Sequence, residues 1–113
     1  MARAKRLERM DIRRAELEAE YEEALIAALR KAAAGSWGLF DHNQDRQMRV
    51  AWQTVVTDLC DRGQEIDRLR DALGLNPFAL HDEFETSRGP VPPTAPGEPR
   101  QAQAWLDRLA KRS

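Results

Sequence analysis

Two long stretches of this chain, residues 5–34 and 46–74, place apolar residues at intervals of three and four positions. This spacing brings the apolar side chains of each stretch onto one face of an α-helix. The pattern therefore predicts two long amphipathic helices. The apolar face of the first comprises Leu7, Met10, Leu17, Tyr21, Ala24, Leu25, Ala28, Leu29 and Ala32, and that of the second comprises Met48, Trp52, Val55, Val56, Leu59, Ile66, Leu69 and Leu73.

Glycines mark the ends of both helices. Gly35 and Gly74 follow the two apolar patterns, and glycine readily takes the left-handed conformation that closes a helix. Gly63 lies inside the second helix, where it costs about 1 kcal/mol relative to alanine. We expect either a kink at Gly63 or the close approach of another helix there.

Two shorter helices are predicted after the long pair. Asn76-Pro77 has the order of an N-cap followed by the first helical residue, and this predicts a helix through Phe84 that ends near Gly89. Residues 90–99 contain five of the six prolines, which predicts an extended linker. A last helix is predicted over about residues 99–111.

The expected architecture is all-α, because no strand pattern is found. Residues 1–89 are predicted to form a long antiparallel helical hairpin with a short third helix. Residues 90–98 form the proline-rich linker, and residues 99–113 contain a C-terminal docking helix. A hairpin of this kind is elongated, since a 30-residue helix is about 45 Å long.

The segment between the long helices contains three large apolar side chains, Trp37, Leu39 and Phe40. Aromatic residues in a loop on a rigid scaffold can form an exposed recognition surface. The alternative is that these side chains fold inward and plug the end of the hairpin. We favour the plug, because three large apolar side chains are costly to leave in water.

An isolated pair of long helices exposes part of its apolar surface, including Trp52 and Val56, and such a patch is typical of an interface. We expect this surface to be covered by other copies of the chain, giving a homo-oligomer, or by the short helices folding back. The last helix presents Trp105, Leu106 and Leu109 on one face. A helix this short needs a partner for stability, either its own hairpin or a separate protein.

Charge is distributed unevenly, although the net charge is only −1. Residues 1–14 carry six basic side chains against two acidic ones, and the following stretch is acidic. The basic residues can contact nucleic-acid phosphates, or they can pair with acidic residues of a neighbouring chain. Both interpretations stay open, and no helix-turn-helix spacing indicates sequence-specific recognition. The basic residues are Arg3, Lys5, Arg6, Arg9, Arg13 and Arg14.

Candidate chemistry is sparse, so we expect no catalytic residue, no metal and no cofactor. The single cysteine, Cys60, excludes an intramolecular disulfide and lies on an apolar helix face, where cysteine behaves as a small hydrophobic residue. His81 and Glu85 lie one helical turn apart, but a zinc site needs three or four ligands. No secretion signal and no apolar stretch long enough to span a membrane is found, so we expect a cytoplasmic protein.

This arrangement resembles the oligomerisation core and C-terminal tail of phage-type small terminase subunits, over residues 5–34, 46–74 and 98–113. The resemblance implies rings of helical hairpins that recognise the DNA to be packaged and regulate a large motor subunit through a C-terminal segment. Many members of that family carry an N-terminal helix-turn-helix domain. The first predicted helix leaves no room for one in this sequence, so we do not expect specific DNA recognition through such a domain.

The sequence therefore favours a non-enzymatic assembly or adaptor protein that self-associates and recruits a partner through its last helix. One alternative is a monomeric regulator, such as an inhibitor or antitoxin-like protein. Another is a small nonspecific DNA-binding protein. A metal- or redox-dependent enzyme would require His42, His81 and Cys60 to lie close together.

Overall fold

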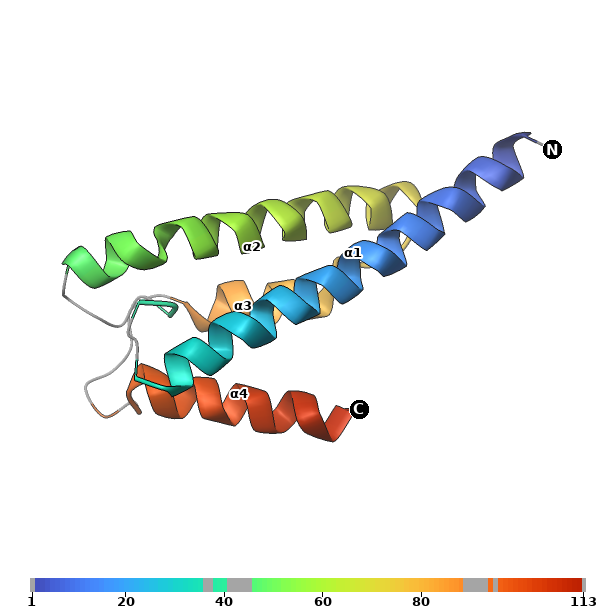
Figure 1. Cartoon of the computed structure of the whole chain (residues 1–113). Coiled ribbons are helices and arrows are strands. Elements are labelled where there is room, and N and C mark those ends of the chain that lie inside the picture. Colours follow the sequence, from blue (N-terminus) through green and yellow to red (C-terminus); the bar gives the residue numbers. More distant parts are fainter. Residues whose placement is uncertain (1, 36–37, 41–45, 89–93, 95, 113) are drawn as a thin grey trace.

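A computed structural model describes residues 2–35, 38–40, 46–88, 94 and 96–112, and shows an all-α fold (Figure 1). It contains helices α1 (Ala2–Ala33), α2 (Arg46–Ala72), α3 (Ala79–Ser87) and α4 (Glu98–Arg112). Successive helices run in alternating directions in Figure 1. The all-α prediction is confirmed, and the predicted long helices match α1 and α2 to within a few residues.

The molecule is elongated, with extents of 56 × 29 × 22 Å and a radius of gyration of 16.0 Å. A compact domain of this length would have a radius of gyration of about 13 Å. The difference arises because α1 is about 48 Å long at 1.5 Å per residue. Figure 1 shows its N-terminal end projecting beyond the other helices.

α1 is the central helix of the core, because it packs against both α2 and α4, whereas α3 packs against α2. All four helices and the segment 38–40 contribute buried side chains, so the short helices complete the core that the two long helices leave open. The buried apolar residues are Leu17, Tyr21, Leu25, Ala28, Leu29, Ala32, Leu39, Phe40, Trp52, Leu59, Ile66, Leu80, Phe84, Ala102, Trp105 and Leu109.

Gly74 ends the α2 region as predicted. Its φ of +73° is left-handed, its N–H donates to the carbonyl of Asp71, and the N–H of Leu75 donates to the carbonyl of Arg70. This pair of bonds is the Schellman motif, which satisfies carbonyls that a helix end leaves without partners. The long second helix therefore closes where the sequence indicates.

The predicted start of the third helix is wrong. Asn76 and Pro77 precede the helix, which begins at Ala79 with Phe78 in the N-cap position and no side-chain cap. Instead, the N–H of Phe78 donates to the Asp67 carboxylate of α2 at 2.8 Å. A carboxylate from a neighbouring helix thus replaces the local cap that the sequence suggested.

Gly63 allows α3 to approach α2 closely, which is one of the two outcomes expected from its position. The His81 ring of α3 lies directly over it, and a Cβ built at Gly63 would lie 2.2 Å from Cδ2 of that ring. Any larger residue at position 63 would displace His81.

Of the predicted linker, only Thr94, Pro96, Gly97 and Glu98 are described, and the others lie outside the described residues. Gly97 accepts the first-turn hydrogen bond of α4 from the N–H of Gln101. α4 itself begins at Glu98, one residue before the predicted boundary.

Candidate interaction site

No element in the described part of the chain covers the N-terminal half of α1. We call residues 2–16 the arm. From Arg3 to Glu16 every side chain is exposed except Met10 and Arg14, which are half-buried, and burial begins at Leu17. Glu18 then accepts a hydrogen bond from Arg70 Nη1 of α2 at 3.0 Å. The arm therefore ends at the point where α1 begins to contact the other helices.

The predicted basic residues of the arm fall into two groups. Arg14 is held between Asp11, at 2.8 Å from its Nε, and Glu18. These two hydrogen bonds raise the pKa of the Arg14 guanidinium above its ordinary value, so it stays charged and paired. Arg13 lies 3.5 Å from Glu16. The exposed remainder comprises Arg3, Lys5, Arg6 and Arg9.

The arm also carries apolar side chains in water. Leu7 is 37% exposed and Ile12 is 55% exposed. Leu7 and Met10 continue, by three- and four-residue steps, the same face that Leu17 and Tyr21 bury further along α1. A helical segment this short is marginal by itself in water. The arm thus exposes apolar side chains that a partner could cover, and a partner would stabilise it as a helix.

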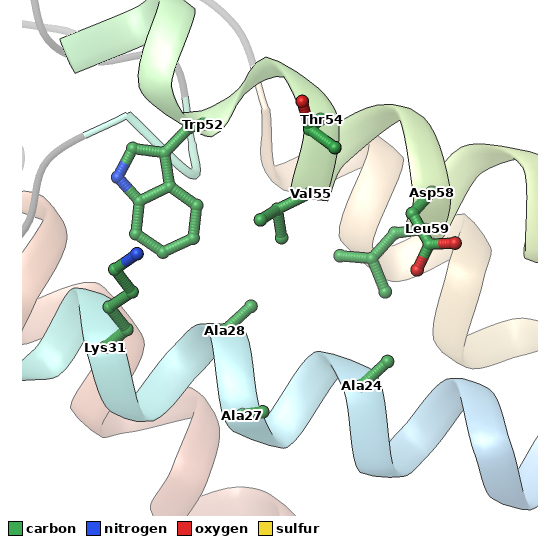
Figure 2. A pocket seen from close by; sticks show the side chains of 9 residues that line it. All are labelled: Ala24, Ala27, Ala28, Lys31, Trp52, Thr54, Val55, Asp58 and Leu59. Carbon is green, nitrogen blue, oxygen red and sulfur yellow. The ribbon is translucent and has the colours of Figure 1, made fainter.

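A second feature lies between α1 and α2, where an open groove of about 480 Å³ is lined mainly by apolar side chains (Figure 2). Small residues of α1 form one wall, and Trp52, Val55 and Leu59 of α2 form the other. Figure 2 shows Lys31 and Trp52 at one end and Asp58 and Leu59 at the other. The complete lining is Ala24, Ala27, Ala28, Lys31, Trp52, Thr54, Val55, Asp58 and Leu59. We call this hollow the groove.

Trp52 and Val56 are less exposed than the sequence suggested. Trp52 is only 3% exposed, and the Lys31 ammonium lies 5.3 Å from its ring centroid, a cation–π distance. Val56 is half-buried. Of this predicted partner surface on α2, Trp52 lines the groove and Val56 does not.

The predicted partner-binding face of the last helix is covered by its own chain. Trp105 and Leu109 are buried, Leu106 is half-buried, and α4 packs against α1. The Arg112 guanidinium also lies 3.3 Å from Glu83 and links α4 to α3. These side chains pack on α1 of the same molecule, which is one of the two alternatives that the sequence left open for this helix.

Residues 38–40 are fixed by charged side chains that sequence reasoning missed. Glu98 is fully buried, and its carboxylate accepts hydrogen bonds from the N–H groups of Gly38, at 2.7 Å, and Phe40, at 2.5 Å. Arg88 Nε donates to the carbonyl of Leu39 at 3.0 Å. Nothing in the local sequence distinguishes Glu98 from an exposed first-turn glutamate.

The side chains of Leu39 and Phe40 are fully buried and point into the core, which is the inward arrangement that we favoured. Trp37, the third residue of the predicted plug, lies outside the described residues.

A chain of polar contacts starts at the buried Tyr21 of α1 and continues through the buried His81 of α3 to the exposed Glu85. The Tyr21 hydroxyl lies 2.8 Å from His81 Nδ1, and His81 Nε2 lies 3.0 Å from Glu85. When Tyr21 donates to Nδ1, Nε2–H is left to donate to Glu85, so each ring nitrogen has a partner. Burial raises the pKa of Tyr21, and it also raises the pKa of the nearby Cys60 thiol. A raised pKa disfavours the thiolate, the reactive form of cysteine.

The described residues contain no group of three His, Cys, Asp or Glu side chains arranged to hold a metal. His42, which the enzyme alternative requires, lies outside the described residues. Among the described helices, none combines the length and the apolar character needed to cross a membrane.

Comparison with known proteins gives no assignment. No family model matches this sequence, and no curated protein or solved structure shows significant similarity to it. The arm and the groove are therefore the features from which we infer a function.

Proposed function

We propose that this chain is a non-enzymatic helical assembly protein that self-associates through the arm. The observation that carries the proposal is the arm itself, a marginal helical segment with exposed Leu7 and Ile12 and no described element covering it. Apolar side chains presented on a rigid helix are a common basis of helix-to-helix recognition. The other helices hold this segment in place, because α1 continues without a break into the core.

The position of α4 changes which surface we assign to binding. Its apolar face already packs on α1, so recruiting a partner through Trp105 would require α4 to detach from the core. We therefore place the principal binding surface on the arm. A role in DNA packaging, as in small terminase subunits, is part of the same proposal, because an oligomer would bring several basic arms together.

The test is the mass of the purified chain, measured by light scattering over a range of concentrations. We expect an oligomer that a variant with Leu7→Asp and Met10→Asp converts to a monomer of unchanged helix content. The matched control, Ala15→Asp, changes an exposed alanine on another side of the same arm and should leave the mass unchanged. A wild-type chain that stays monomeric at every concentration would overturn self-association and favour a monomeric regulator, for which α3 and α4 are already folded back.

A second candidate is nonspecific binding of nucleic acid, supported by the exposed basic group on the arm. Arg6 and Arg9 are exposed, whereas Arg14 is paired with Asp11 and Glu18. We expect any duplex-DNA affinity to fall steeply with salt concentration and to be lost with Arg6→Glu and Arg9→Glu. DNA binding that survives this reversal would count against the arm as the nucleic-acid site.

A further inference from the structure

The arm and the groove both present apolar side chains, yet they cannot meet within one molecule. Leu7 and the middle of the groove at Ala27 lie on the same helix, about 30 Å apart at 1.5 Å per residue. Because α1 is continuous between them, the arm cannot fold back into its own groove. The arm of another copy has no such restriction.

The groove has the dimensions of a short helical segment. Its α2 wall runs from Trp52 to Leu59, which is about two helical turns. Leu7 and Met10 lie one turn apart on the arm, so both fit within that length. The alanines on the α1 wall leave room for a helix to approach closely, while Trp52 and Val55 offer apolar contact.

Charge along α1 is also self-complementary. Arg6, Arg9 and Arg13 recur by three and four residues, and Glu16, Glu20 and Glu23 continue the same spacing toward the groove. These residues therefore lie along one side of the helix, basic first and acidic second. When two copies of such a helix lie antiparallel, the basic part of each faces the acidic part of the other.

We propose that two copies of this chain form a two-fold dimer in which their α1 helices pack antiparallel and each arm occupies the other copy's groove. This inference rests on the proposed self-association and specifies its geometry. In this register Leu7 contacts the α2 wall of the second copy at Val55, and Met10 lies toward the Leu59 end of that wall. Arg9 and Arg13 face Glu23 and Glu20 of that copy.

The antiparallel direction follows from two features of the monomer. A parallel pair would place Arg9 beside Arg9 and Glu20 beside Glu20, which is repulsive. A parallel pair would also place α2, α3 and α4 of both copies at the same end of the dimer, because in each copy these helices cover the half of α1 that carries Leu17 and Tyr21. The antiparallel pair separates these two sets of helices and makes the same contact twice, as a closed two-fold interface requires.

The ion pairs that these residues form within one molecule do not prevent them from pairing with a second copy. Arg13 lies 3.5 Å from Glu16, and Glu20 lies 3.6 Å from Arg62, and all four side chains are at least one-third exposed. Exposed pairs of this kind contribute little to stability. They can therefore be replaced by contacts with a second copy at small cost.

A charge exchange tests the geometry on the full-length chain. One variant carries Arg9→Glu and Arg13→Glu, and the other carries Glu20→Arg and Glu23→Arg. Alone, each variant places like charges at both contacts, and we expect its dimer dissociation constant to rise at least tenfold. Mixed in equal amounts, the two variants have opposite charges at both contacts and should form a heterodimer of near wild-type affinity.

A third variant serves as the control for general attraction between oppositely charged proteins. Arg68→Glu with Lys111→Glu changes two exposed residues on α2 and α4 and gives the same net charge as the arm reversal. This variant keeps the wild-type contacts and should dimerise with itself, but it should form a heterodimer with the Glu20→Arg, Glu23→Arg variant far less readily than the arm reversal does. A heterodimer as tight as that of the arm reversal would show that net charge, not the arm, drives association.

The groove is tested separately by filling it. Ala27 is exposed in the monomer and lines the groove, so Ala27→Trp should block the arm of a second copy without changing the core. Ala15→Trp, on another side of α1, is the matched control and should dimerise like the wild type. Circular dichroism checks that all variants retain their helix content.

The outcomes separate this inference from the proposed function. A wild-type chain that is always monomeric overturns both. A wild-type oligomer that is unaffected by the charge reversals and by Ala27→Trp keeps self-association but overturns the arm-in-groove geometry. Loss of the dimer in the single variants and its recovery only in the correct mixture supports the geometry.

Discussion

The two halves of α1 have the same apolar periodicity, but the apolar face is exposed in one half and buried in the other. In the arm, residues 2–16, Leu7 is 37% exposed, whereas in residues 17–33, which we call the anchored half, Leu25 and Leu29 are fully buried. The sequence pattern identifies the face of a helix that is able to be buried, but it does not say what covers that face. Here α2, α3 and α4 cover only the anchored half.

The polar contacts differ in the same way. In the anchored half, Glu18 binds Arg70 of α2 and Tyr21 binds His81 of α3, so polar groups join separate helices. In the arm, Arg13 and Arg14 pair with residues one turn away. The exposed Arg13–Glu16 pair contributes about 0.3–0.5 kcal/mol and positions nothing outside the helix.

The largest difference is expected from matched leucine substitutions in the two halves. Leu29→Ala leaves a cavity in the core and should lower the free energy of unfolding by about 3–4 kcal/mol. Leu7→Ala removes an exposed side chain and should change it by less than about 0.5 kcal/mol. Urea unfolding, measured at a concentration where the chain is monomeric, gives both values. Equal losses would mean that the arm is packed in solution and that the two halves do not differ.

A somewhat smaller loss is expected at the carboxylate that fixes residues 38–40 to α4. Glu98→Ala leaves the N–H groups of Gly38 and Phe40 buried without their acceptor, which should cost about 3 kcal/mol. Glu98→Gln retains one acceptor oxygen and should lose roughly half as much. The matched control for the arm is Glu8→Ala, at an exposed position, which should be close to neutral. A neutral Glu98→Ala would show that this carboxylate does not hold the segment.

These results indicate which parts of the structure were readable from the sequence. The two long helices and the closure at Gly74 follow from local spacing and from the properties of glycine, and both are predicted. The close approach at Gly63 is one of the two outcomes that its position allows. The start of α3 was not predicted correctly, because a carboxylate from α2, Asp67, binds the N–H of Phe78 in place of the expected local cap.

The candidate site was only partly predictable, because it too depends on contacts between distant parts of the chain. Trp105 and Leu109 were correctly placed on one apolar face, but whether that face binds α1 or another protein depends on long-range packing. Arg14 looks like the other basic residues of the arm, yet it is held by Asp11 and Glu18. Glu98 has no local signal at all. Contacts between residues far apart in sequence account for each of these differences.

An intermediate effect is expected where α3 touches α2. Gly63→Ala adds a Cβ that would lie 2.2 Å from the His81 ring, and overpacking of this kind typically costs about 1–3 kcal/mol. Alanine regains about 1 kcal/mol of helix propensity, so we expect a net loss of up to about 2 kcal/mol in urea unfolding. In a His81→Ala background the clash is absent, and Gly63→Ala should then be neutral or stabilising. The same loss in both backgrounds would place the effect elsewhere than at His81.

The smallest change in stability that we predict concerns the contact between Tyr21 and His81. The arm has no contact of this kind. Burial, and then the nearby Cys60, Glu85 and Asp67, raise the pKa of Tyr21 above its ordinary value of about 10. Because the folded-state pKa is the higher one, the stability from this group is fully present below about pH 10 and is lost as the pH rises above it.

Tyr21 is the only tyrosine, so the tyrosinate absorbance of the whole chain reports this residue alone. We expect that absorbance to stay low above pH 10 until the helices unfold, with both followed together by absorbance and circular dichroism. Tyr21→Phe should cost about 1 kcal/mol at neutral pH, because His81 Nδ1 loses its partner, and should weaken the alkaline loss of stability. Titration near pH 10 with the helices intact would mean that Tyr21 reaches water and that the anchored half is less enclosed than its burial indicates.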